Sequence, residues 1–131
     1  MEKKLVIVTP IYEDTKSAKK LILELQKIFR DKLYFVAVDD GSVKEPVNIK
    51  LLDDNNSNGT ILRLTKNIGH QAAIAVGLHY VANKIDVCEK IIVMESDCEE
   101  DPKTAKNLVE DLDNEDIDSA VGKRKKRSEV M

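Results

Sequence analysis

Three acidic residues alternate along one short stretch of the chain: Glu95, Asp97 and Glu99. In an extended segment, side chains two positions apart point to the same side, so these carboxylates are expected to project together. Clustered carboxylates repel one another unless a cation lies among them, and their hard oxygen atoms suit Mg²⁺ or Mn²⁺. Such a cation can hold a diphosphate and neutralise the charge on a departing nucleotide. The alternative interpretation is a solvated acidic loop before the next helix.

A second polar stretch, Asp39-Asp40-Gly41-Ser42, also has two possible roles. Asp and Gly are common in turns, so one carboxylate could simply accept hydrogen bonds from backbone amides. One carboxylate could instead accept a hydrogen bond from a ligand, such as the ring N–H of a base. The residues leave both interpretations open. Tyr12 has a similar choice between packing under a loop and stacking on a base.

Alternating apolar runs and helical patterns must position these residues. Short β-branched runs predict buried strands at 5–9, 33–38, 61–64, 90–94 and 119–122. Apolar residues at three- and four-residue spacing predict helices at 14–30, 49–52, 70–83 and 103–112. We expect Pro10 to end the first strand and Asp14 or Thr15 to cap the helix that follows. This order predicts an α/β fold with a mostly parallel sheet and helices on both faces.

The helix from residue 70 begins with a segment of small and polar residues. Gly69 permits a tight turn there, and Ala72, Ala73 and Gly77 are expected to allow close packing on the sheet. We interpret His70 as a hydrogen-bonding residue of the helix start rather than as a catalytic base.

Ligands of parallel sheets bind beyond the carboxyl ends of the strands, and these ends meet at one edge. Polar groups follow three predicted strands, at 9–14, 39–42 and 95–97. We therefore expect one site at this edge rather than three unrelated loops. The basic run at 123–127 usually indicates a solvated tail, but it could instead attract phosphate or an anionic membrane surface, and its position after the last predicted strand makes it a candidate for contact with phosphate.

Composition excludes several classes of function. The chain has 131 residues, 21 of them Lys or Arg and 24 Asp or Glu, for a net charge of −3. With only five aromatic residues and no Trp, a nucleic-acid partner is not expected. No apolar run reaches the roughly 20 residues of a membrane span, and the N-terminus does not resemble a signal peptide. Cys88 and Cys98 are interpreted as free thiols in the cytoplasm.

Taken in order, these motifs resemble those of family-2 glycosyltransferases, which have a Rossmann-like GT-A fold. The opening Pro-Ile-Tyr-Glu-Asp resembles the family's P-x-Y-N-E, with Glu13 and Asp14 in place of Asn and Glu, and 38–42 matches V-D-D-G-S. The remaining segments resemble the subgroup that glycosylates polyprenyl phosphates: 67–78 (N-x-G-H-Q-A-A-x-x-x-G-L), 95–102 (D-A-D-L-Q-D-P-P) and 122–127 (G-x-R-x-x-R). Glu95 replaces the usual first Asp and is one methylene longer.

The resemblance implies a role for each matching residue. The nucleotide would be held by Thr9, Pro10, Tyr12, Asp14, Asp40, Glu95 and Ser96, with Asp40 at the base. Glu95, Asp97 and Glu99 would surround Mg²⁺ or Mn²⁺, with Asp97 as the catalytic residue. Arg124 and Arg127 would meet the acceptor phosphate. The family's reaction inverts the anomeric centre by direct displacement of a nucleoside diphosphate.

The resemblance also implies the partners: a UDP- or GDP-sugar and a lipid-phosphate or saccharide acceptor. Members of this family continue into an acceptor-binding region, sometimes with an interfacial helix or membrane spans. Residues 1–131 are therefore expected to be the nucleotide-sugar-binding domain of a longer, cytoplasmic enzyme at the inner face of the membrane, with the acceptor-binding region missing. This chain alone could then be inactive.

Three alternatives come from other classes of protein. The first is a domain that binds a nucleotide or a partner but transfers nothing. The second is a phospho-receiver domain, which needs a single Asp after the third strand, where this chain has Thr65-Lys66-Asn67. The third, a dinucleotide-binding domain, is disfavoured because no G-x-G-x-x-G follows any strand.

Overall fold

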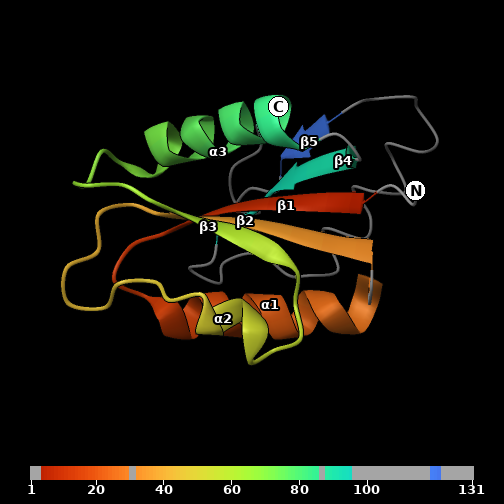
Figure 1. Cartoon of the computed structure of the whole chain (residues 1–131), viewed down its shortest axis with the longest axis horizontal. Helices are drawn as coiled ribbons and strands as arrows, with labels where there is room; N and C mark the ends of the chain where they lie inside the picture. The colour runs from red at the N-terminus through yellow and green to blue at the C-terminus, as the bar shows by residue number, and fades with distance from the viewer. Residues whose placement is uncertain (1–3, 30–31, 86–87, 96–118, 122–131) are drawn as a thin grey trace, which may run out of the picture.

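A computed structural model describes residues 4–29, 32–85, 88–95 and 119–121 (Figure 1). In chain order the elements are β1 (Lys4–Ile11), α1 (Thr15–Phe29), β2 (Leu33–Asp39), α2 (Lys50–Asp53), β3 (Gly59–Arg63), α3 (His70–Lys84), β4 (Cys88–Val93) and β5 (Ser119–Val121). The strands form one sheet in the order β3-β2-β1-β4-β5, and its four pairings are all parallel. The expected α/β class is confirmed. The expected helix at 103–112 lies outside the described residues.

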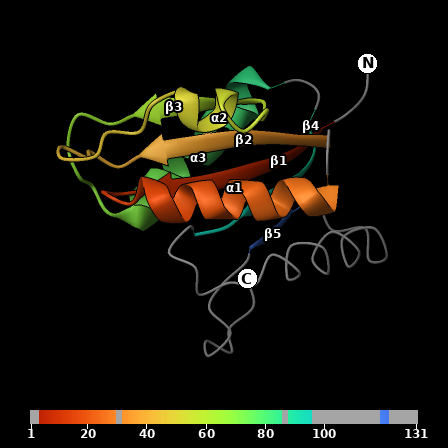
Figure 2. The ribbon, with the colours of Figure 1, turned by 90° about the horizontal axis from the view of Figure 1, so that it is seen from below.

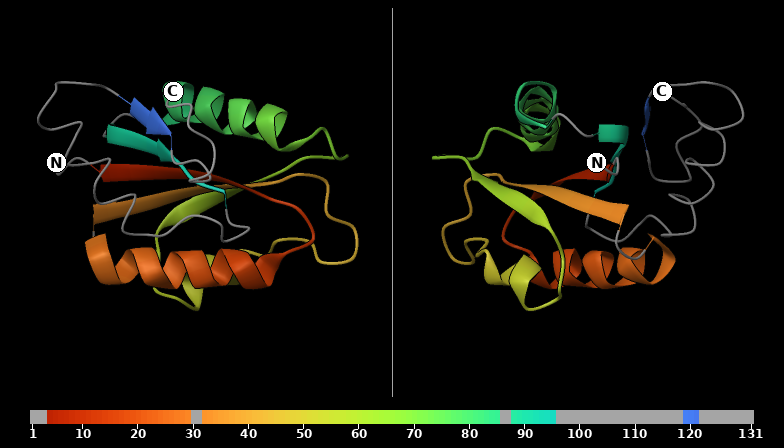
Figure 3. Two further views of the ribbon diagram at one scale, coloured as in Figure 1. Left: turned by 180° about the vertical axis from the view of Figure 1, so that it is seen from behind. Right: turned by 45° about the vertical axis from the view of Figure 1, so that its right-hand side comes forward.

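Helices cover both faces of the sheet, as predicted. Figures 1 and 2 show α1 and α2 on one face and α3 on the other, and Figure 3 shows the same layers from two further sides. Successive residues of β1 face opposite sides, so Leu5 and Ile7 pack on the side of α1 while Val6 and Val8 pack on the side of α3. A strand covered on both faces explains the uninterrupted β-branched run in the sequence.

The expected end of the first strand at Pro10 is wrong, because β1 continues through Pro10 to Ile11. The Val8 carbonyl accepts a hydrogen bond from the Met94 amide, so Pro10, two residues on, faces the same side of the strand. The last β1–β4 pair joins Val8 to Val93. The lack of an N–H at Pro10 therefore breaks no hydrogen bond between the paired residues of β1 and β4. A strand tolerates proline where its N–H is not needed for pairing.

The strand β3 begins two residues before its expected start. Gly59 pairs with Phe35 of β2, and the Phe35 amide donates to the Asn58 carbonyl at 2.8 Å. Pairing with β2 thus overrides the low strand propensity of Gly. The pattern of apolar residues alone gave no sign of this extension.

The helix α3 contacts the sheet through small residues. Ala73, Gly77 and Val81 are buried, as the spacing predicts, whereas Ala72 is exposed, so its expected role in packing on the sheet is wrong. A Cβ atom at Gly77 would lie 2.6 Å from Cγ1 of Val8 on β1. The helix and the sheet therefore approach too closely for a side chain at this position.

Substituting Gly77→Val is expected to lower the free energy of unfolding by about 2 kcal/mol, since overpacking a core costs roughly 1–3 kcal/mol. Urea unfolding of the two chains measures this difference. Ala82→Val is the control, because Ala82 is exposed on the same helix and adds no contact with the sheet. Val forms helices more readily than Gly and less readily than Ala, so a loss at Gly77→Val no larger than that at Ala82→Val would contradict the assigned packing.

The order of the strands reverses direction at β1. The chain runs outward from β1 to β2 and β3, and then returns to place β4 on the other side of β1. In such sheets, ligands bind at the carboxyl ends of the strands beside this reversal. The loops after β1, β2 and β3 gather at this edge, on the left of Figure 1. Among the described residues, no helix has the length and apolar character needed to cross a membrane.

Candidate functional site

The carboxylate of Asp40 holds the loop between β3 and α3. Asp40 is only 2% exposed. Its Oδ1 accepts a hydrogen bond from the Ile68 amide at 2.8 Å, and its Oδ2 accepts from the Gly69 amide at 3.1 Å and from Asn67 Nδ2 at 2.9 Å. Gly69 is the N-cap residue of α3, so the negative charge also lies where the helix dipole favours it. Asp40 thereby links the end of β2 to the start of α3.

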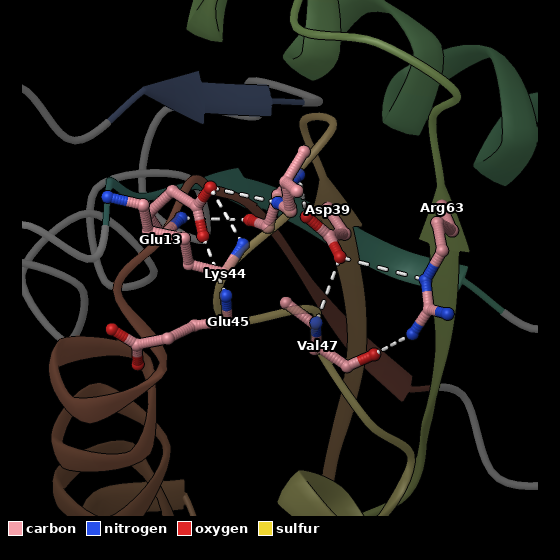
Figure 4. Close-up of polar contacts among 8 residues, drawn as sticks. Glu13, Asp39, Lys44, Glu45, Val47 and Arg63 are labelled. Atoms are coloured by element: carbon pink, nitrogen blue, oxygen red, sulfur yellow. Dashed lines mark hydrogen bonds and ion pairs between the residues drawn. The ribbon is translucent and has the colours of Figure 1, made fainter.

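The neighbouring carboxylate of Asp39 is fully buried and holds the loop after β2 (Figure 4). Its Oδ1 accepts from the Ser42 amide at 3.0 Å, and its Oδ2 accepts from the Val47 amide at 2.9 Å. Arg63 of β3 forms an ion pair with the same Oδ2 and also donates to the Val47 carbonyl. Both aspartates therefore cap backbone amides, one of the two roles that the sequence left open.

The residues at the end of β1 and just after it have separate surroundings. Thr9 is buried, and its Oγ1 has no hydrogen-bond partner among the described residues. Tyr12 is 53% exposed, so it does not pack under a loop of the described structure. Asp14 caps α1, because its Oδ1 accepts a hydrogen bond from the Ser17 amide at 3.1 Å. The capping role predicted for Asp14 is confirmed.

Glu13 binds three successive amides of the loop after β2, a role that the sequence did not suggest. Its carboxylate accepts hydrogen bonds from Val43 at 2.8 Å, Lys44 at 3.2 Å and Glu45 at 2.7 Å. Its own amide donates to Ser42 Oγ at 2.8 Å. The backbone at Glu13 is left-handed, with φ of 51°. Asn adopts this conformation far more readily than Glu, which gives a physical reason for the Asn of the P-x-Y-N-E motif.

The amides of Val43 and Glu45, followed by the amide and charge of Lys44, hold the pKa of Glu13 below its usual 4.5, against a smaller opposing effect of burial. A lowered folded-state pKa means that this carboxylate stabilises the fold above pH 4.5 and that the contribution is lost as pH falls through the folded value.

We expect the difference in unfolding free energy between the wild type and Glu13→Gln to be constant near neutral pH and to shrink below pH 4.5. Urea titrations from pH 7 to pH 3 measure it, and a difference that grows on acidification would contradict the assignment.

Glu95 follows β4 and meets the first residue of α3. Its carboxylate contacts His70 Nδ1, so the segment after β4 is joined to the same helix start that Asp40 holds. His70 thus makes a hydrogen bond at the helix start, as predicted. Glu95 and Asp40 thus come from the ends of two different strands and bind neighbouring residues: Glu95 contacts His70, the first residue of α3, and Asp40 binds Gly69, its N-cap.

Several predicted site residues lie outside the described residues: Ser96, Asp97, Glu99, Arg124 and Arg127. Within the described ranges, no group of three His, Cys, Asp or Glu side chains could hold a metal ion. Of the predicted metal ligands, only Glu95 belongs to the described structure. The metal site therefore remains a prediction from the sequence.

The sequence also missed Arg63 and Asn67 as polar partners of Asp39 and Asp40. Both contacts join residues more than 20 positions apart, and neither residue stands out by type. For Glu13, the available signal was its replacement of Asn in an otherwise matching motif.

Comparison with known proteins bears on what this edge of the sheet does. Over 132 aligned residues, the chain is 27% identical to the dodecaprenyl-phosphate galacturonate synthase of Rhizobium johnstonii; the alignment covers 97% of this chain and 38% of that protein. The chain thus spans well under half the length of this curated relative. The fold is similar to that of S. aureus TarS residues 1–349, with a TM-score of 0.61 and 22% identity over 85% of this chain and 32% of the other.

The family itself follows from a match over almost the whole chain. Residues 6–130 match the family described as Glycosyl transferase family 2. This range begins two residues inside β1 and includes β2 to β5, together with the acidic residues that follow β1, β2 and β4. The expected family and fold are therefore confirmed, and the chain belongs to glycosyl transferase family 2.

Proposed function

We propose that this chain is the nucleotide-sugar-binding domain of an inverting glycosyltransferase that transfers a sugar to a polyprenyl phosphate. The observation that carries the proposal is the convergence at the carboxyl edge: Asp40 after β2 and Glu95 after β4 both bind the start of α3. This edge borders the reversal of strand order, where α/β sheets bind ligands. Family membership supplies the class of reaction.

The described residues suggest how the base of the donor is held. A carboxylate offers about four acceptor positions, and Asp40 uses three of them, which leaves one for the ring N–H of a base. The exposed ring of Tyr12 offers a face on which the base can stack. The buried Thr9 hydroxyl has no partner among the described residues, which suits a group that hydrogen-bonds to a ligand.

The diphosphate is proposed to lie beside the segment after β4. Glu95, Asp97 and Glu99 would supply carboxylate oxygens to Mg²⁺ or Mn²⁺, and this donor chemistry fits either ion. When bound, the cation would neutralise charge on the departing nucleoside diphosphate. His70 would hold the Glu95 carboxylate in place, and Pro10, Asp14 and Ser96 would complete the nucleotide contacts.

The acceptor is proposed from the similarity of this chain to a dodecaprenyl-phosphate galacturonate synthase. A phosphate monoester has a second pKa of about 6, so at neutral pH its oxygen is already largely anionic and needs no strong general base. This oxygen would attack the anomeric carbon as the bond to the diphosphate breaks, which inverts the centre. Arg124 and Arg127 would bind the acceptor phosphate, and the longer protein would act at the inner face of the membrane.

Calorimetry with UDP, GDP and UDP-sugars, each with EDTA or with manganese, tests the donor part of the proposal. We expect at least one nucleotide to bind, and manganese to tighten binding about tenfold through the diphosphate. Binding of no nucleotide under either condition would refute the proposed function. Nucleotide binding without transfer to lipid phosphate, by this chain or by a longer protein that includes the acceptor-binding region, would favour the non-catalytic alternative.

A further inference from the structure

The loop that follows β2 is organised around a carboxylate from a different loop. The amides of Val43, Lys44 and Glu45 all point at the side chain of Glu13, with donor–acceptor distances of 2.8, 3.2 and 2.7 Å (Figure 4). Successive amides that converge in this way form an anion-binding nest. Here the anion belongs to the protein itself, and it is 30 or more residues away in sequence.

The contact between the two loops is reciprocal. The Glu13 amide donates to Ser42 Oγ, so main chain and side chain of Glu13 both bind the 42–45 loop. Glu13 also has a left-handed backbone, which is unfavourable for a non-glycine residue, and such strain persists only where surrounding contacts impose it. These contacts indicate that Glu13 holds the 42–45 loop in one defined position.

The same loop is connected to the proposed nucleotide contacts. The Ser42 amide donates to Asp39 Oδ1, and Asp39 is followed directly by Asp40, the residue proposed to meet the base. Tyr12, the proposed stacking residue, directly precedes Glu13. A change in how Glu13 holds the loop therefore acts on both sides of the proposed base site.

We propose that Glu13 is a positioning residue that pre-organises the 42–45 loop for the nucleotide. This inference rests on the proposed function. If the loop loses its anchor, only a fraction of molecules has the competent conformation, and the apparent Kd rises in inverse proportion to this fraction. The carboxylate lies in a surface network rather than in the hydrophobic core, so we expect its loss to affect binding far more than global stability.

The test compares three variants of the full 131-residue chain by calorimetry with the nucleotide that the wild type binds. Glu13→Gln removes the charge, and Glu13→Asn suits the left-handed backbone but cannot span to all three amides. Both should raise Kd about tenfold, in line with the strength of hydrogen bonds to a charged group. Glu45→Gln is the matched control: it also removes one carboxylate charge from this pair of loops, but the Glu45 side chain is outside the nest and, among the described residues, accepts a hydrogen bond from Thr15 Oγ1 alone. It should stay within about twofold of wild type.

Thermal unfolding and amide exchange separate positioning from folding. For Glu13→Gln we expect a melting temperature within a few degrees of wild type and faster exchange of the Val43 and Glu45 amides. Wild-type affinity in either Glu13 variant would overturn the inference, and so would a loss of affinity that merely follows global unfolding. If the wild type itself binds no nucleotide, the proposed function fails and the inference fails with it; wild-type binding with unaffected Glu13 variants rejects the inference alone.

Discussion

Replacing Asp40 with Asn is expected to lower the free energy of unfolding by about 3 kcal/mol, because it leaves buried donors without acceptors. The carboxylate accepts from Ile68 on one oxygen and from Gly69 and Asn67 on the other. Whichever way an Asn side chain is turned, its NH₂ group faces at least one N–H donor. Urea unfolding measures the loss, and we expect nucleotide affinity, measured below the unfolding transition, to fall at least tenfold.

Two controls separate the causes of this effect. Asn67→Ala removes the NH₂ group that donates to Asp40 Oδ2 and to the Asp40 carbonyl, but it leaves the bonds from the Ile68 and Gly69 amides to the carboxylate, so it should cost about 1 kcal/mol. Asp53→Asn changes an exposed acid on α2 and should leave stability unchanged. An Asp40→Asn chain that is as stable as the wild type would show that the carboxylate does not hold the start of α3.

Replacing Gly41 with Ala is expected to cost about 3 kcal/mol or more, since two separate penalties act at this position. The first is backbone strain, because φ at Gly41 is +74°. The second is steric, because a Cβ atom here would lie 2.3 Å from the Lys66 carbonyl carbon and 2.4 Å from the Asn67 amide nitrogen. Both contacts are with backbone atoms, which cannot move away by a change of rotamer as side-chain atoms can.

Gly69 provides the matched comparison for Gly41. It also has a positive φ, of +96°, but a Cβ atom there would meet nothing within 4 Å. Gly69→Ala should therefore show backbone strain alone, about 1–3 kcal/mol, because φ of 96° with ψ of 149° is close to a conformation that essentially only glycine adopts. Urea unfolding of the two variants, measured side by side, tests whether Gly41→Ala loses more stability than this strain alone. Equal losses would contradict the close approach of the β2 and β3 loops.

Much of the fold could be predicted from local patterns. The β-branched runs located β1, β2 and β4 because strands covered on both faces have no polar side to interrupt them. Their ends were less predictable. Pro10 lies within β1 because β4 has ended on that side, and Gly59 belongs to β3 because Phe35 pairs with it. These boundaries depend on neighbouring strands rather than on the residue itself.

The candidate site was predictable in its place but not in its internal contacts. Strand order and the acidic strand ends indicated which edge to examine. Residue types alone could not distinguish Asp39 from Asp40, and only the family resemblance singled out Asp40, since their difference lies in which distant loop each one holds. Glu13 was overlooked for the same reason, because the three amides that define its role lie 30 to 32 residues further along the chain.

The strand order described above also has a consequence for how the domain assembles. The strands β1, β2 and β3 pair consecutively within residues 4–63, whereas β4 must return across some 80 residues of chain to reach β1. Contacts that close long loops form late, because the chain loses the entropy of loop closure before the contact contributes any stabilisation. During synthesis, the half that contains Asp39 and Asp40 can therefore form before Glu95 leaves the ribosome. The contact between Glu95 and the start of α3 therefore forms after the pairing of β1, β2 and β3, so the ability to bind a ligand there would report that both parts of the sheet have come together.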